Sequence, residues 1–308
     1  MKVFAPNYYK KFSCIADKCK HSCCIGWEID IDDETLKQYN SLETKFSKKI
    51  KENIVANDDC ACFKLTDNER CPFLNEKNLC EIILNLGEYS LCQICSDHPR
   101  FRNYFGDRIE IGLGLTCEEV ARIVVNETEC FGLVEIDETD ETSTIYEDEI
   151  TFLELRNELF EIINKEQNFD SVVNKLLNKF NIELPQKSNC EWFDIYSHLE
   201  MLDNNWGVLL NEFKSQEGTL FSLPHSNNNA LKNLLIYFIY RHLSESIYDG
   251  NFRGRLLFAI ISCYMISSLC DYKHKIENVA RMYSSEIEYS DENLSNLINL
   301  LQEENLEE

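Results

Sequence analysis

Cysteine is the residue type in this chain whose number and spacing could do chemistry. The chain has 308 residues and 15 cysteines, and 12 of the cysteines fall between Cys14 and Cys130. The series opens with Cys14-x4-Cys19-x3-Cys23-Cys24 and continues with Cys71-x8-Cys80-x11-Cys92-x2-Cys95. So many thiols in one segment indicate a metal site, a disulfide framework or redox chemistry.

The expected compartment and the spacing of the cysteines favour a metal site over disulfides and redox chemistry. The first 14 residues contain no apolar run and no small-residue cleavage site of a secretory signal. We therefore expect a cytoplasmic protein, in which thiols stay reduced and free to bind metal. The cysteine count is odd, and spacings of zero to four residues are too tight for most disulfides. Disulfides and reactive thiols remain the alternatives.

Nine cysteines are the predicted metal ligands. An iron-sulfur cluster takes four thiolates and apolar surroundings, so nine thiols near residues such as Trp27 and Phe73 could serve one or two clusters, 4Fe-4S being the expected type. Zinc takes four Cys or His ligands and would leave several thiols unused. The predicted ligands are Cys14, Cys19, Cys23, Cys24, Cys71, Cys80, Cys92, Cys95 and Cys117.

Other candidates for the site have simpler explanations. His21 and His98 each neighbour a cysteine and could replace a thiol, but both could equally be exposed side chains. The pair Cys60-x-Cys62 has no other ligand nearby in the sequence. Four further cysteines in apolar surroundings are expected to be small core residues: Cys130, Cys190, Cys263 and Cys270.

The elements around the cysteines are expected to be short. Residues 33–55 predict a helix capped by Asp32 or Asp33, and residues 79–86 predict another that stops at Gly87. Residues 101–115 alternate weakly and predict a hairpin that turns at Gly106-Asp107. Residues 117–126 predict a third helix.

The second half of the chain is helical in pattern, so the fold class is expected to be mainly α. Apolar residues repeat at helical spacing from Leu231 to Ile239, and five or six such stripes predict a bundle. The apolar stretch 256–270 is too short to span a bilayer and is expected in the bundle centre. We expect three parts: 1–134 cysteine-rich and irregular, 135–149 an acidic linker, and 150–308 a helical domain with a fraying tail at 302–308.

The net charge argues against some classes of binding partner. The formal net charge of −24 argues against nucleic acid and against an anionic membrane, because both are bound chiefly through Lys and Arg. An acidic surface favours a cationic partner. The chain contains no complete Gly-x-Gly-x-x-Gly fingerprint, no phosphate-binding loop with Lys and no His-Glu-x-x-His motif.

Taken together, several motifs resemble one known family. They are Cys14, Cys19, Cys23-Cys24-x-Gly26-Trp27, Cys71-Pro72-Phe73-Leu74, Leu79-Cys80, Leu86-Gly87-Glu88, Leu91-Cys92-x2-Cys95, Pro99-Arg100 and Thr116-Cys117-x2-Val120-Ala121-Arg122. This joint pattern resembles the flagellin lysine N-methylase family, densely over residues 8–125 and loosely through the helical half. The cysteine-rich half is also similar to a broader family of zinc- or iron-chelating domains with a Cys-Cys pair.

The resemblance implies a cytoplasmic bacterial enzyme that methylates the ε-amino nitrogen of flagellin lysines. It implies an iron-sulfur cluster and S-adenosylmethionine as the methyl donor, with flagellin or another lysine-bearing protein as the partner. Gly26 stands where the Cys-x3-Cys-x2-Cys signature of radical enzymes would need its third cysteine after Cys19 and Cys23. The alternatives are a zinc-binding interaction module without catalysis and a redox or cluster-carrier protein.

Overall fold

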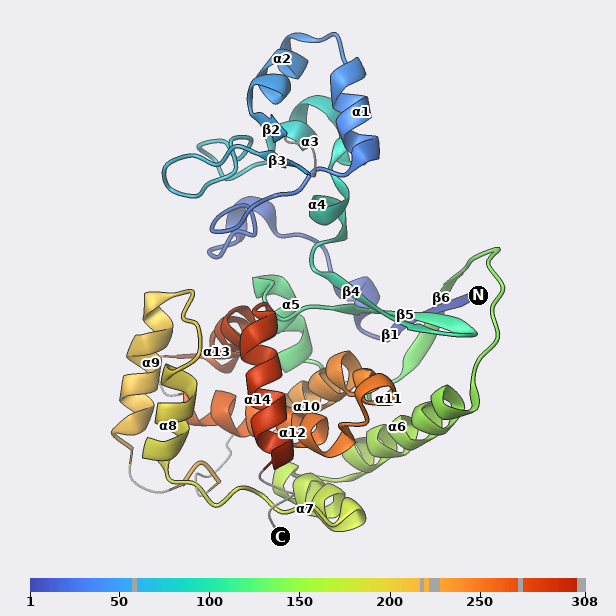
Figure 1. Ribbon diagram of the computed structural model, residues 1–308, viewed down its shortest axis with the longest axis vertical. Coiled ribbons are helices and arrows are strands. Elements are labelled where there is room, and N and C mark those ends of the chain that lie inside the picture. Colours follow the sequence, from blue (N-terminus) through green and yellow to red (C-terminus); the bar gives the residue numbers. More distant parts are fainter. Residues whose placement is uncertain (57–59, 217–218, 222–227, 271–273, 304–308) are drawn as a thin grey trace. The chain divides into compact units, whose positions relative to one another are not determined.

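The computed structural model describes residues 1–56, 60–216, 219–221, 228–270 and 274–303. The fold is mainly α with small sheets, as the sequence predicted. The chain forms two compact units (Figure 1). We call Ser13–Arg100 the cysteine unit, and Met1–Phe12 together with Phe101–Glu308 the helical unit.

The cysteine unit consists of short elements. Its helices are η2 (Ala16–Lys18), α1 (Asp33–Ser41), α2 (Lys45–Glu52), α3 (Glu81–Leu86), η3 (Glu88–Ser90) and α4 (Gln93–Asp97). Strands β2 (Ile54–Ala56) and β3 (Ala61–Phe63) form an antiparallel pair. A small core of Phe63, Phe73, Ile29 and Tyr39 holds these elements together.

The helix expected over 33–55 is wrong as one helix. Asp32 caps α1 as predicted, by accepting from the Thr35 backbone N–H at 2.9 Å. The helix ends at Ser41, and α2 begins after Thr44, which forms a reciprocal capping box with Ser47. The apolar periodicity runs through this break because both helices pack on the same small core.

The helical unit contains a four-stranded sheet in the order β4-β5-β1-β6. Its strands are β1 (Lys2–Pro6), β4 (Arg100–Phe105), β5 (Arg108–Leu113) and β6 (Leu133–Glu138). Strand β1 pairs parallel with β5 and antiparallel with β6. The predicted turn at Gly106-Asp107 lies between β4 and β5, and the predicted third helix is α5 (Glu118–Val125).

The expected acidic linker at 135–149 is not a free connection. Residues 133–138 form β6, which pairs with β1 along its whole length. The stretch continues into α6 (Glu147–Lys165), and Glu149 near its start is buried. The compact units accordingly divide after Phe12 and Arg100, whereas the expected boundary lay near residue 140.

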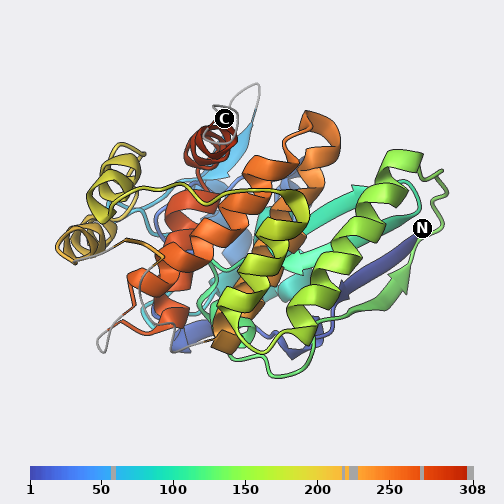
Figure 2. The same ribbon diagram turned by 90° about the horizontal axis from the view of Figure 1, so that it is seen from below.

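The remaining helices form the body of the helical unit (Figures 1 and 2). Within the described residues they outnumber the five or six helices expected. They are α7 (Phe169–Phe180), α8 (Asn189–Ser197), α9 (Asn204–Lys214), α10 (Asn228–His242), α11 (Ser246–Asp249), α12 (Phe252–Ser268), α13 (Ile276–Tyr283) and α14 (Asp291–Glu303), with the single turn η4 (Leu243–Glu245) and the π-helix η5 (Ser284–Glu288). Residues 304–308 of the expected tail lie outside the described residues.

Helices α10 and α12 form the centre of this unit, as predicted for the apolar stretch 256–270. Phe238 and Phe258 from the two helices are fully buried and meet edge to face, with ring centroids 5.9 Å apart. Helix α6 lies on the sheet, where Phe152 stacks on Phe105 of β4. In the described part of the chain, we find no helix long and apolar enough to cross a membrane.

Candidate metal centre

A short strand-like pairing brings the Cys23-Cys24 segment to Cys71. The Cys71 backbone N–H donates to the Cys24 carbonyl at 2.8 Å, and the Gly26 N–H donates to the Glu69 carbonyl at 2.9 Å. Gly26 has φ +89°, a conformation that costs glycine little and other residues much. A cysteine at position 26 would therefore be strained. This is a physical reason why the chain lacks the third cysteine of the radical-type signature.

Cys80 is brought back to the same place by a tight loop. The Leu74 N–H donates to the Cys71 carbonyl, and Leu74 forms an isolated antiparallel bridge with Cys80. The Glu81 N–H then donates to the Phe73 carbonyl at 2.7 Å. Cys80 is the residue before α3, whose last residue precedes Gly87 with φ +92°, as the sequence predicted.

The Cys92-x2-Cys95 pair lies in the first turn of α4. Cys92 is the N-cap residue of this five-residue helix, and its carbonyl accepts from the Cys95 N–H at 3.0 Å. Asp32, the cap of α1, also accepts from the Gln93 N–H at 2.8 Å. One carboxylate thus connects the starts of α1 and α4 and fixes the turn that carries the two thiols.

These five thiols share the core of the cysteine unit. Cys71 and Cys92 are 6% and 1% exposed. Cys24, Cys80 and Cys95 are half-buried and pack against the same apolar cluster. The five residues whose thiols the structure brings into one core are Cys24, Cys71, Cys80, Cys92 and Cys95, which we call the thiol core.

The thiol core is also linked electrostatically. Burial, together with the neighbouring Cys24, Cys80 and Cys92, raises the pKa of Cys71 to about 12. A hydrogen bond from the Cys95 thiol lowers the pKa of Cys92 and raises that of Cys95 itself. A hydrogen bond with the Cys23 thiol lowers the pKa of Cys24 to about 7. The thiols are therefore close enough to share protons and to oppose one another's ionisation.

The donor set of the thiol core fits an iron-sulfur cluster in its chemistry. A four-iron cluster needs four thiolates and a water-poor wall, and five thiols here lie among Phe73, Ile82 and Tyr39. Their present arrangement is looser than a ligand shell. Across the described residues, no three His, Cys, Asp or Glu side chains converge closely enough to form a metal site.

The other four predicted ligands are not part of the thiol core. Cys14 and Cys23 are exposed, although the Cys23 thiol hydrogen-bonds with that of Cys24. Cys19 follows η2, and its thiol donates to the His21 carbonyl at 3.3 Å. Cys117 belongs to the helical unit, where it is the N-cap residue of α5. The nine-residue ligand set stays a prediction, of which the structure gathers five members.

The cysteines outside the predicted ligand set differ in how exposed they are. Cys62 hydrogen-bonds with Glu28, and this contact raises the Cys62 pKa to about 11. Cys263 is buried and Cys270 half-buried, as expected of core residues, but Cys130 and Cys190 are exposed. For Cys190 the expectation failed because α8 buries its neighbours Asn189 and Trp192 and turns position 190 outward. No disulfide joins any of the 15 cysteines, all of which the structure describes.

Of the two candidate histidines, His98 is the more enclosed. Burial lowers the pKa of His98 to about 4, and its ring lies 6.4 Å from that of Trp27. The Trp27 indole N–H donates to the Cys23 carbonyl. A neutral imidazole near the Cys23-Cys24 segment is the form that can ligate metal, whereas His21 is exposed.

The helical unit contains a buried polar cluster that sequence reasoning missed. Glu288, at the end of the π-helix, contacts His242 Nε2 at 2.5 Å and accepts from Tyr237 Oη at 3.0 Å. The Arg241 guanidinium lies 3.4 Å from Glu288 and between the rings of Phe101 and Tyr289, each centroid 5.0 Å away. The available signal was the i, i+4 spacing of Tyr237 and Arg241 on one helix face.

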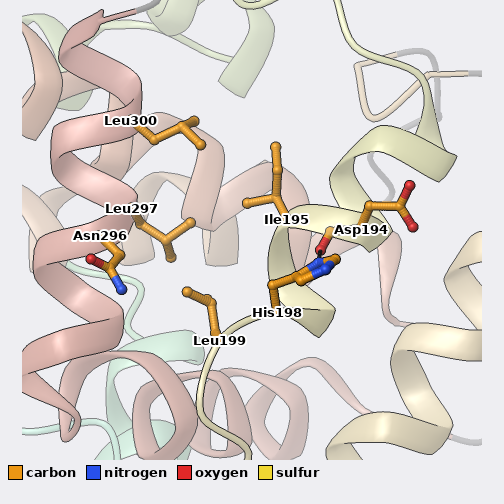
Figure 3. Close-up of a pocket in the computed structure, with 7 residues that line it drawn as sticks. All are labelled: Asp194, Ile195, His198, Leu199, Asn296, Leu297 and Leu300. Atoms are coloured by element: carbon orange, nitrogen blue, oxygen red, sulfur yellow. Dashed lines mark hydrogen bonds between the residues drawn. The ribbon is translucent and has the colours of Figure 1, made fainter.

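A groove in the helical unit, between α8 and α14, is a second place where a ligand could bind (Figure 3). It has a volume of about 390 Å³, and apolar residues Ile195, Leu199 and Leu297 form much of its wall. His198 is its one ionisable ring, and its Nδ1 lies 2.6 Å from the Asp194 carbonyl. Its mostly apolar lining suits the binding of an apolar group.

Comparisons with known proteins find distant relatives for part of the chain. No protein-family model matches the chain, and no solved structure matches it. The Lysine-N-methylase of Salmonella typhimurium (strain LT2) is 28% identical over 158 residues, which are 47% of this chain and 38% of that protein. The chain is distantly similar to lysine-N-methylases.

Two further relatives agree with this similarity. The Lysine-N-methylase of Salmonella choleraesuis matches to the same extent. The Flagellar biosynthetic protein FliU of Salmonella muenchen is 28% identical over 144 residues, which are 43% of this chain and 82% of FliU. The match thus spans well under half the length of the lysine-N-methylases but most of FliU.

Proposed function

We propose that the protein is a protein-lysine N-methyltransferase that transfers a methyl group from S-adenosylmethionine to ε-amino groups of flagellin. The cysteines of the cysteine unit, with the thiol core at their centre, hold an iron-sulfur cluster, 4Fe-4S being the type we expect. The single observation that carries the proposal is the similarity to the Salmonella lysine-N-methylases.

The thiol core supports the cluster part of the proposal. Cys24, Cys71 and Cys80 are brought together by backbone pairing, and Cys92 and Cys95 by one helical turn. Once bound by these thiolates, an iron-sulfur cluster supplies one-electron chemistry or braces the surrounding loops. Without a cation, burial and neighbouring thiols keep Cys71 and Cys80 protonated.

The transfer itself places a simple demand on the protein. The lysine nitrogen must have lost its proton, so that its lone pair can form the new N–C bond. The C–S bond of the donor breaks at the same time, and its sulfur leaves as the neutral thioether of S-adenosylhomocysteine. An apolar pocket lowers the lysine pKa and holds the two reactants in line.

The experiment that tests the function is methyl transfer with matched variants. Anaerobically purified protein is incubated with methyl-labelled S-adenosylmethionine and flagellin, and labelled lysines are located by mass spectrometry. We expect methylated flagellin lysines from the wild type and from Cys60→Ala, an exposed cysteine outside the thiol core. We expect none from Cys92→Ala.

Iron, sulfide and zinc are measured on the same samples. Iron and sulfide in the wild type that disappear in Cys92→Ala support the cluster. Stoichiometric zinc without iron, and no labelled flagellin, would instead support a zinc-binding interaction module. Iron and sulfide without methyl transfer would support a cluster carrier.

A further inference from the structure

One edge of the sheet in the helical unit has no partner. Strand β6 is last in the order β4-β5-β1-β6, and its only ladder among the described residues is with β1. Figure 2 shows this strand, in green, outermost in the sheet beside the N-terminal strand. Alternate residues of an edge strand present backbone N–H and C=O groups outward, where another strand can pair.

Four of the six residues of β6 are exposed. Val134 is 40% exposed, and Glu135, Asp137 and Glu138 are exposed as well. The register slips between Val3 and Phe4 of β1, where two residues of that strand face three of β6. Such a bulge bends an edge and strengthens its twist without occupying its outer groups.

The charge along this edge is strongly one-sided. Between Arg122 and Arg156 the sequence has eleven Asp and Glu residues and no Lys or Arg. Two positive groups lie beside this stretch: Lys2 Nζ contacts Glu135 Oε2 at 2.7 Å, and the N-terminal ammonium donates to the Thr139 carbonyl at 2.8 Å. Exposed acids not engaged in a salt bridge in the described structure continue along and beyond the strand: Asp137, Glu138, Asp140 and Glu141.

These charges decide what can occupy the edge. The same edge of a second copy would bring like carboxylates together, which destabilises strand pairs. Nucleic acid is repelled for the same reason. An extended peptide with alternating lysines fits both requirements, because its backbone can pair with β6 and its ammonium groups can reach the acidic side chains.

We propose that the free edge of β6 binds an extended, lysine-rich segment of a partner protein as an additional strand. The identity of that partner as the methylated substrate rests on the proposed function; the binding does not. Main-chain hydrogen bonds provide the affinity, and Asp137, Glu138, Asp140 and Glu141 select for positive charge.

The test uses a fluorescent eight-residue peptide that alternates lysine and threonine. Its binding to the full-length protein is measured by fluorescence anisotropy at low salt. Two isomers carry N-methyl groups on alternate backbone nitrogens, one isomer on the lysines and the other on the threonines. Because a strand pairs through every second residue, we expect one isomer to lose at least about tenfold in affinity and the other to keep it.

Matched variants test the charges. Replacing Asp137, Glu138, Asp140 and Glu141 by Asn or Gln should weaken binding about tenfold, given a few tenths of a kcal/mol for each exposed pair. The control replaces four exposed acids remote from β6 in the sequence, Glu154, Glu161, Glu183 and Glu292, by Gln and should leave the affinity unchanged. Thermal unfolding confirms that both variants are folded.

Three outcomes overturn the proposal. If both N-methyl isomers bind equally, charge alone holds the peptide and no strand is added. If a glutamate-threonine peptide binds as well as the lysine peptide, the acidic edge does not select. If the lysine peptide does not bind and sedimentation shows a stable dimer, the edge is not open to a peptide strand. A failed methylase assay alters none of these readouts, since no donor is present.

Discussion

The two units of this chain fill their interiors with different chemistry. The core of the helical unit is aromatic and aliphatic, with Trp192, Trp206 and Tyr283 fully buried. The core of the cysteine unit is small and mixes thiols such as Cys71 and Cys92 with Phe63 and Phe73. Domains of fewer than about 70–80 residues bury a modest core and often depend on metal or disulfides, and the cysteine unit, residues 13–100, is only slightly larger. From this comparison we expect apolar burial to contribute more to the stability of the helical unit, and metal binding by the thiols to add to the stability of the cysteine unit.

The largest expected effect is in the aromatic core. Phe238 contacts Phe258, Tyr283 and His242, so Phe238→Ala leaves a cavity and should lower the unfolding free energy of the helical unit by about 4 kcal/mol. Urea unfolding measures it. Tyr248→Ala, at a residue 70% exposed in the same unit, should change little. Equal losses for the two variants would contradict burial as the stabilising force.

A buried ion pair gives the next effect. Arg156 of α6 contacts Glu110 of β5 at 2.7 Å, with both side chains buried, and its guanidinium faces the rings of Phe105 and Phe160. Arg156→Met leaves the Glu110 carboxylate buried without its cation and should lower the free energy of unfolding by about 3 kcal/mol. Adding Glu110→Leu should recover much of this loss in a double-mutant cycle. A double variant less stable than the single one would show that the pair itself stabilises the unit.

A smaller effect is expected in the cysteine unit. Tyr39 Oη donates to the Ser90 carbonyl at 2.6 Å inside this unit. Tyr39→Phe leaves that carbonyl unpaired and should cost about 1 kcal/mol. Hydrogen exchange of the 81–97 amides reports it, with the helical unit as internal reference. A change confined to the helical unit would contradict the independence of the two units.

The pH dependence of the two units should have the same sign and separable origins. Burial lowers the pKa of His98 to about 4 and also lowers that of His242. The free energy of unfolding is therefore unaffected by either histidine above pH 6.5. It falls as the pH drops below 6.5, because the histidine takes up a proton in the unfolded chain before it does so in the folded protein. Glu288 also has a lowered pKa: burial opposes ionisation, but Arg241 and His242 outweigh it. Its contribution is lost only at lower pH.

Two variants assign this dependence. His242→Gln should flatten the pH 7 to 5 loss of stability in the helical unit only, and His98→Gln in the cysteine unit only. Chemical denaturation at both pH values, on metal-free protein, gives the slopes. If either substitution left its own unit's slope unchanged, burial of that imidazole would not explain the pKa.

Local signals in the sequence predicted local structure well. The Asp32 cap, the stop at Gly87 and the turn at Gly106-Asp107 depend on residues next to them in the chain. The break between α1 and α2 was missed because the Thr44 capping box competes with a continuous apolar stripe. Strand β6 was missed because its pairing with β1 joins residues more than 120 positions apart, which no local pattern encodes.

The same distinction between local and distant contacts holds for the candidate metal site. Cys92 and Cys95 are neighbours by spacing alone, so sequence suffices for them. Their meeting with Cys24 and Cys71 requires a backbone pairing between distant segments. Spacing could not distinguish Cys117, which directly precedes a helix in the other unit, from the members of the thiol core.

We propose that metal binding by the thiols of the cysteine unit is needed for methyl transfer to lysine. The most direct test is the ratio of labelled methyl incorporated into flagellin by Cys92→Ala and by Cys60→Ala, each purified anaerobically and compared at equal concentration of folded helical unit. We expect wild-type incorporation by Cys60→Ala and none by Cys92→Ala. Equal incorporation by the two variants would contradict it.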